Sequence, residues 1–168
     1  MNIPGALKPY VVLFQALDGH GQVWSPSGQF LGLLSRVPHN PNSIINPYGP
    51  YGSSESPTSI QNPQGLYGGS QGSYSPYNLI CINPPVIFYQ GHPLLLITRN
   101  LNIFTNGLNL VDPDLILTIY EELSNSRPEP ISRRSEMVRL ALRNITQVNQ
   151  GSKTSLKYSF SSAKHPTL

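Results

Sequence analysis

A serine motif in the middle of the chain is the pattern closest to a catalytic signature. Gly68-Gly69-Ser70-Gln71-Gly72 matches the G-x-S-x-G pattern of serine hydrolases, and Asp112 and His165 follow in the order usual for that class. In those enzymes the serine stands on a sharp turn between a buried strand and a helix. Here the motif lies among turn residues, with neither element beside it. We therefore expect a flexible loop at Ser70 and keep a hydrolase only as an alternative.

The other reactive side chains indicate no metal or cofactor site. The histidines are too far apart to form a pair of metal ligands: His20, His39, His92 and His165. Asp112 and Asp114 stand where a helix begins, which favours a capping role over acid–base chemistry. No glycine-rich loop has the spacing that binds phosphate. Cys81 lies between two isoleucines, and we expect a buried thiol.

Tyrosine is the abundant side chain with potential for binding. Five of the nine tyrosines fall within residues 37–85, close to Asn and Ser: Tyr48, Tyr51, Tyr67, Tyr74 and Tyr77. Rigid amphipathic rings beside adaptable hydrogen-bonding groups are typical of binding surfaces. These rings could line a cleft for a glycan or a protein segment, or fill the centre of a small domain that has few Leu or Val. The composition favours the second interpretation, in which Tyr51 and Tyr67 belong to the core.

Charge divides the chain into two parts. Charged residues make up only 11% of the 168 residues, against about 25% in ordinary soluble domains. Residues 1–124 hold three Lys or Arg and six Asp or Glu, a net charge of −3, whereas residues 125–168 hold eight and two, a net charge of +6. We expect a domain at 8–124 followed by a basic tail.

The segment 37–85 contains nine Pro and six Gly, and it carries an internal repeat. Residues 41–52 and 57–68 are identical at 8 of 12 aligned positions, at a spacing of 16 residues. A weaker third copy follows at Ser75-Pro76-Tyr77-Asn78. Each unit consists of turn residues with a few apolar anchors, so several units must pack together to form a core. We expect Ile44 and Ile60 to point to that core.

Short apolar runs flank the repeats. Those of β type are Tyr10–Phe14, Phe30–Leu34, Val86–Tyr89 and Leu94–Thr98. The last two are separated by Gln90-Gly91 and predict a hairpin. Asp112-Pro113 with apolar residues after it predicts a short helix over 113–123.

Three of these features together carry a family resemblance. They are the Phe30-Leu31-Gly32-Leu33-Leu34-Ser35 run, the twofold Ser-Ile-x-Asn-Pro-x-Gly-x-Tyr-Gly pattern and Asn83-Pro84-Pro85-Val86-Ile87. Over residues 10–123 the chain resembles the bacterial four-fold β-flower domain. The resemblance implies a mainly β fold, a small pseudo-four-fold assembly of short β units with one short C-terminal helix. It implies no biochemical activity.

The basic tail predicts a helix and a disordered end. Apolar residues share one helical face over 132–148, among four arginines: Arg133, Arg134, Arg139 and Arg143. A basic amphipathic helix can dock on its own domain, in a partner's groove, on an anionic membrane or on nucleic acid. For docking on the chain's own domain we expect contacts from Met137, Leu140 and Ile145. After Gly151 little remains to bury, and we expect disorder.

The sequence therefore favours a non-catalytic binding or scaffolding module without a cofactor. A hydrolase with a loop nucleophile is one alternative, and an adaptor that binds nucleic acid or anionic membrane through the tail is another. The start of the sequence has no signal-peptide pattern and no apolar stretch is long enough to span a bilayer. We expect an intracellular protein by default.

Overall fold

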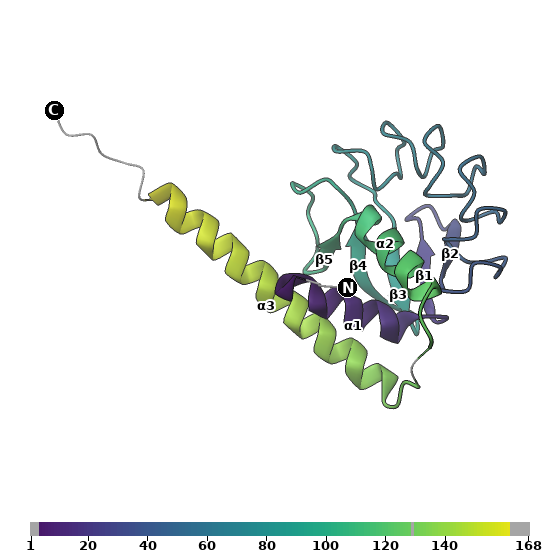
Figure 1. Ribbon diagram of the computed structural model, residues 1–168. Coiled ribbons are helices and arrows are strands. Elements are labelled where there is room, and N and C mark those ends of the chain that lie inside the picture. Colours follow the sequence, from purple (N-terminus) through teal and green to yellow (C-terminus); the bar gives the residue numbers. More distant parts are fainter. Residues whose placement is uncertain (1–3, 129, 162–168) are drawn as a thin grey trace.

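The computed structural model describes residues 4–128 and 130–161, with side chains up to Gly151. A five-stranded sheet carries helices α1 and α2 on one face, and the long helix α3 packs along α1 (Figure 1). The elements are η1 (Gly5–Leu7), α1 (Lys8–Leu17), β1 (Gly21–Trp24), β2 (Phe30–Leu34), β3 (Val86–Tyr89), β4 (His92–Ile97), β5 (Asn109–Val111), α2 (Pro113–Ser124) and α3 (Arg134–Ser161).

The sheet has the order β2-β1-β3-β4-β5. Its first four strands are antiparallel, and β5 lies parallel to β4. The predicted strands at Phe30–Leu34 and Val86–Tyr89 are present, and the hairpin from β3 to β4 turns at Gln90 and Gly91, both with positive φ. Alternate residues of β1 and β3, such as Val23 and Ile87, are fully buried beneath the helices.

The prediction of a strand at Tyr10–Phe14 is wrong, because these residues form the middle of α1. Pro9 stands in the first turn of the helix, where its missing N–H costs nothing. Tyr10, Leu13 and Leu17 are buried at helical spacing against the sheet. Burial of this stripe outweighs the β propensity of the two valines between them. The fold is therefore a mixed sheet with helices, and the expectation of a mainly β domain holds only for the sheet.

Residues 37–85 form a ribbon of turns between β2 and β3, seen as a row of loops in Figure 1. Along the ribbon, backbone N–H groups repeatedly donate to carbonyl oxygens three residues earlier, with four-residue steps from Ser53 to Gly49 and from Gly69 to Gly65. From residue 53 onward the donors are Ser53, Ser56, Ser59, Asn62, Gly65, Gly69, Gly72, Ser75, Asn78 and Cys81. Ile44 and Ile60 are fully buried in the core. The arrangement of the units about a four-fold axis stays a prediction.

Helix α2 begins as its sequence indicates. The Asp112 carboxylate caps it by accepting a hydrogen bond from the Asp114 N–H at 2.8 Å. Pro113 follows at the first helical position, and Ile116, Ile119 and Tyr120 point into the core. The predicted range of 113–123 differs by one residue from Pro113–Ser124.

Helix α3 covers the predicted amphipathic range of 132–148 except for its first two residues, and it docks on α1. Val138, Ala141 and Ile145 are buried in the core, and Met137 packs against it. Leu140, which we expected in this contact, is 54% exposed. The helix continues past Gly151 to Ser161, where the sequence suggested disorder. The rest of the expected disordered end, residues 162–168, lies outside the described residues.

Candidate binding cleft

The five tyrosines of the ribbon do not form one groove. Tyr48 is 92% exposed, whereas Tyr51 packs edge-on against Phe30 with 4.9 Å between ring centroids. Tyr67 stacks on Tyr74 at 6.0 Å and packs against the core. Tyr51 and Tyr67 therefore contribute to packing, although both are only half-buried. Tyr77 is the one of the five that meets charged side chains.

Tyr77 is held by groups from three parts of the chain. Its N–H donates to the Ser75 hydroxyl at 3.1 Å, within the ribbon. The Arg99 guanidinium, which follows β4, lies over the ring at 4.8 Å from its centroid. The Tyr77 hydroxyl donates to Asp114 Oδ1 at 2.8 Å, in the first turn of α2. The ring is thus fixed in position between the ribbon and the helix.

Arg99 joins the two acids at the start of α2. Its Nε donates to Asp112 Oδ2 at 3.1 Å, and its Nη2 pairs with Asp114 Oδ2. The Arg99 N–H also donates to the Pro76 carbonyl at 2.9 Å, which ties β4 to the ribbon. The Arg99 side chain is 35% exposed and that of Asp114 60% exposed, so both can still meet a ligand.

These contacts fix the protonation of the site. Burial, followed by the hydrogen bond to Asp114, raises the pKa of Tyr77 well above its usual range. Burial alone would lower the pKa of Arg99, but its bonds to the two carboxylates outweigh that effect and raise it. Near neutral pH the site therefore presents a neutral phenol and a guanidinium beside Asp112 and Asp114.

An open cleft of about 500 Å³ lies beside this group. Gln61, Pro63 and Ser70 line it from the ribbon, and Asp114 and Leu117 from α2, with Tyr77 and Arg99 between them. Gly68 is also in the wall, and a Cβ there would stand 2.5 Å from the Asn62 carbonyl oxygen, so only glycine fits. The cleft is thus walled by both the repeats and the helix that follows them.

The catalytic candidates from the sequence do not assemble here. Ser70 is exposed on the cleft wall, and none of the described residues lining the cleft is a histidine. Asp112 caps α2 and pairs with Arg99, while His165 lies outside the described residues. Burial raises the pKa of Cys81, whose thiol contacts the Ser73 carbonyl. Within the described ranges no group of three His, Cys, Asp or Glu side chains could hold a metal ion.

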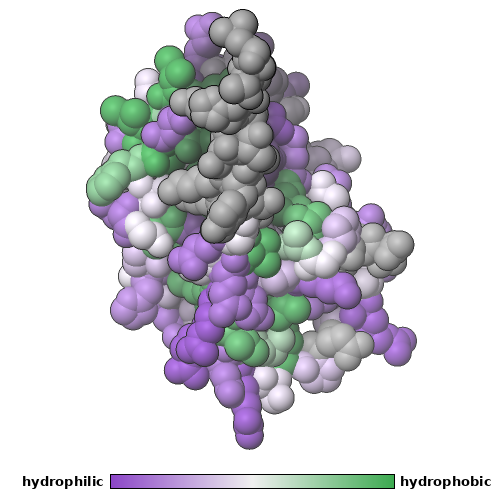
Figure 2. Space-filling model, turned by 90° about the vertical axis from the view of Figure 1, so that its left-hand side faces the viewer, coloured by the Kyte–Doolittle hydropathy of each residue, from purple (hydrophilic) through white to green (hydrophobic). Residues whose placement is uncertain are grey.

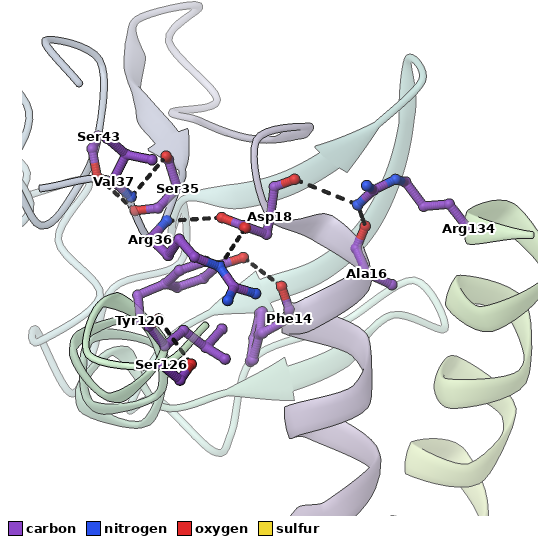
Figure 3. A network of polar contacts seen from close by, with 11 residues as sticks. Phe14, Ala16, Asp18, Ser35, Arg36, Val37, Ser43, Tyr120, Ser126 and Arg134 are labelled. Atoms are coloured by element: carbon purple, nitrogen blue, oxygen red, sulfur yellow. Dashed lines mark hydrogen bonds and ion pairs between the residues drawn. The ribbon is translucent and has the colours of Figure 1, made fainter. Parts of the chain in front are cut away.

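The four arginines of the predicted tail helix, of which Arg133 precedes α3 and the others lie in it, have separate surroundings. Arg134 donates to the Ala16 carbonyl and, at 3.4 Å, to that of Asp18, at the end of α1 (Figure 3). Arg133 pairs with Glu136 at 3.8 Å on the surface. Arg139 and Arg143 are exposed. Arg134 thus anchors the helix, and the others are open to solvent.

Sequence reasoning missed Arg99, the centre of this site. The signal was present, because Arg99 is the only Lys, Arg, Asp or Glu between Glu55 and Asp112. A single charged side chain in such a long uncharged segment indicates an ion-pair partner or a functional role. The sequence pattern at Asp112 and Asp114, which pair with it, indicates only a helix start.

Comparison of this chain with protein-family models, curated proteins and solved structures gives no match. The resemblance to the four-fold β-flower family rests on the sequence pattern and stays a prediction. Among the described residues, no helix has both the length and the apolar character that crossing a bilayer requires.

Proposed function

We propose that this chain is a non-catalytic binding module and that the cleft beside Tyr77 and Arg99 binds a glycan. One observation carries the proposal. Fixed donors and acceptors from the ribbon, β4 and α2 converge on the wall of one open cleft of about 500 Å³. That volume falls in the range of known small-ligand sites.

The chemistry of the cleft fits a ligand with many hydroxyl groups. Each carboxylate oxygen of Asp114 already accepts one bond and has a second lone pair for a ligand hydroxyl. Arg99, Gln61 and Ser70 add donors. Pro63 and Leu117 give only a small apolar area, which suits a sugar ring better than the large side chains of a peptide. The charged groups are mutually paired, so a neutral ligand meets little net charge.

The same geometry supports binding over hydrolysis. A serine nucleophile needs a base within hydrogen-bond reach. The acid in this wall, Asp114, is engaged by Tyr77 and Arg99, and no imidazole lines the cleft within the described part of the chain. Ser70 is thus suited to donate a hydrogen bond to a ligand.

A glycan array probed with the labelled full chain, followed by calorimetry on the glycans retained, tests this function. We expect Asp114→Asn and Ser70→Ala each to weaken the affinity for those glycans, Asp114→Asn by about tenfold or more, because a charge-assisted hydrogen bond is worth about 1.5–3 kcal/mol. Thr118→Ala, an exposed position one turn further along α2, should leave the affinity unchanged.

Two results would reverse the assignment. If the full chain retained no glycan on the array, the proposal that the ligand is a glycan would be wrong. Turnover of a glycan or ester that falls a hundredfold in Ser70→Ala, with unchanged melting, would instead establish the hydrolase alternative.

A further inference from the structure

Half of the large apolar side chains that the described structure leaves exposed lie in two short segments. Leu79, Ile80 and Ile82 are 66%, 82% and 76% exposed at the end of the ribbon. Leu101 and Phe104 are 79% and 84% exposed in the loop between β4 and β5. We call these five residues the apolar tips. Single exposed apolar residues are ordinary, but a group of five requires an explanation.

The two segments lie side by side. The Asn100 side-chain amide donates to the Cys81 carbonyl at 3.0 Å and joins them directly. In the view of the side toward which α3 projects, hydrophobic residues gather at the upper left (Figure 2). Leu101 and Phe104 also line an open hollow of about 640 Å³ that reaches Asn149 of α3. Leu101 and Phe104 therefore border the helix.

Turn hydrogen bonds hold the tips in place. Asn78 Oδ1 accepts from the Ile80 N–H at 3.1 Å, and Asn100 Oδ1 accepts from the Asn102 N–H at 3.0 Å. The Cys81 N–H donates to the Asn78 carbonyl at 3.1 Å. Because the backbone is already ordered by these bonds, burying the tips costs little further conformational entropy.

The two tip segments carry no acid, although Asp112, which is paired with Arg99, lines the same hollow as Leu101 and Phe104. Arg99 is the only formal charge from 56 to 111, so both segments are free of acids. From Arg139 to Ser161, α3 carries two arginines, Lys153 and Lys157, and no acid. The helix is fixed next to this region, since Asn149 donates to Asn109 at 3.1 Å, and beyond it the helix projects from the body on the same side (Figure 1).

We propose that the apolar tips and the basic second half of α3 together bind an anionic membrane surface. Peripheral binding of this kind combines apolar side chains buried at the headgroup boundary with cations that face anionic lipids, and neither alone is enough for stable attachment. The aliphatic tips favour a bilayer over nucleic acid, whose backbone offers nothing to bury them. The cations of α3 favour an anionic surface over a second copy of the chain, whose tips would bring a second basic helix close to the first.

Vesicle co-sedimentation of the full chain tests this proposal and does not depend on the cleft. The vesicles are phosphatidylcholine alone and phosphatidylcholine with phosphatidylserine, each at low and high salt. We expect binding to the anionic vesicles that weakens as salt rises, and far weaker binding to phosphatidylcholine alone. Ile80→Asp combined with Leu101→Asp should lower the affinity at least tenfold at both salt concentrations.

Matched variants separate the two contributions. Lys153→Glu with Lys157→Glu should lower the affinity for anionic vesicles and flatten its salt dependence. Val37→Asp, which changes a 51% exposed apolar residue outside the tips, should bind like the unchanged chain. Circular dichroism and thermal melting identical to the parent chain show that each variant folds.

Three results would overturn the proposal. The first is no binding to anionic vesicles, and the second is full binding by the Ile80→Asp, Leu101→Asp variant. The third is self-association or duplex DNA binding without vesicle binding, which would assign the surface to a second copy of the chain or to nucleic acid.

Discussion

Asn46, Asn62 and Asn78 each make the same two hydrogen bonds in successive repeats. Their amide nitrogens donate to carbonyls six residues earlier, at 3.1, 3.0 and 3.0 Å. Their amide oxygens accept from the N–H two residues later, at 3.0, 3.0 and 3.1 Å. Ser43, Ser59 and Ser75, all fully buried, accept in the same way from the residue two positions on. These Asn and Ser side chains thus form hydrogen bonds with backbone groups that, in a β-sheet, would pair with a neighbouring strand.

Replacing Asn46 with Ala should destabilise the fold. Asn46 is 7% exposed, and the variant leaves the Tyr48 N–H without its partner and removes one of the two hydrogen bonds that the Asn40 carbonyl accepts, the other coming from the Ser43 N–H. An unsatisfied group costs about 1–3 kcal/mol, so we expect a loss of about 1–3 kcal/mol in the free energy of unfolding by urea. Asn42→Ala, at an exposed position four residues away, should change it by less than about 0.5 kcal/mol. Equal losses in the two variants would contradict the capping role.

The buried phenol of Tyr120 should make the fold less stable at alkaline pH. It is fully buried, its hydroxyl donates to the Phe14 carbonyl at 2.8 Å, and burial followed by the charge of Asp18 raises its pKa far above normal. Since the unfolded phenol ionises near pH 10, its contribution is complete below about pH 10 and is lost as the pH rises above it. Urea unfolding from about pH 9 to pH 11 should show a smaller slope for Tyr120→Phe than for the parent chain. Tyr48→Phe, at a 92% exposed ring, should keep the parent's slope.

Among the elements, those with strong local signals could be predicted from the sequence. The Asp112-Pro113 cap fixes the start of α2, and Gln90-Gly91 fixes the β3–β4 hairpin. Helix α1 could not be distinguished from a strand, because its five apolar residues in a row suit either, and only packing against the sheet decides. Strands β1 and β5 have four and three residues, and their pairing depends on partners distant in sequence.

Helix α3 should contribute to stability only through the face that packs against α1. Ile145 is fully buried in the core beside α1, whereas Leu140 is 54% exposed. Ile145→Ala should lower the free energy of unfolding by about 2–4 kcal/mol, and Leu140→Ala by less than about 1 kcal/mol. Thermal melting of the two variants measures the difference. If both changes left the melting temperature unaltered, α3 would be a solvated tail and not part of the fold.

At the scale of the whole molecule, the candidate site forms only when folding brings together segments that are far apart in the sequence. Tyr77, Arg99 and Asp114 come from the ribbon, the end of β4 and the start of α2. Each of them has a signal in the sequence: Tyr77 belongs to a repeat, Arg99 is the only charge in a long segment, and Asp114 is an acid in the first turn of a helix. Their meeting depends on the sheet order, which places β4 between β3 and β5. The apolar tips escaped prediction for the same reason, since their two segments are neighbours only in the folded chain.

Asp18 links three parts of the fold in a comparable way. Its carboxylate accepts from the Arg36 N–H at 2.8 Å and pairs with Arg36 Nε at 2.6 Å, where the chain leaves β2 (Figure 3). Its carbonyl accepts from Arg134 at the start of α3. The side chains of Arg36 and Asp18 are 9% and 20% exposed, so the pair is largely shielded from water.

Removing one partner of the Asp18–Arg36 ion pair should lower the free energy of unfolding far more than removing both. Asp18→Asn leaves the buried Arg36 charge uncompensated, and we expect a loss of about 3 kcal/mol in urea unfolding. Adding Arg36→Met to Asp18→Asn should recover part of that loss, because the stranded charge is then gone. The exposed pair of Arg133 and Glu136, 3.8 Å apart, provides the control, and Glu136→Gln should change stability by less than about 0.5 kcal/mol. A double variant less stable than Asp18→Asn alone would mean that Arg36 acts through contacts other than this ion pair.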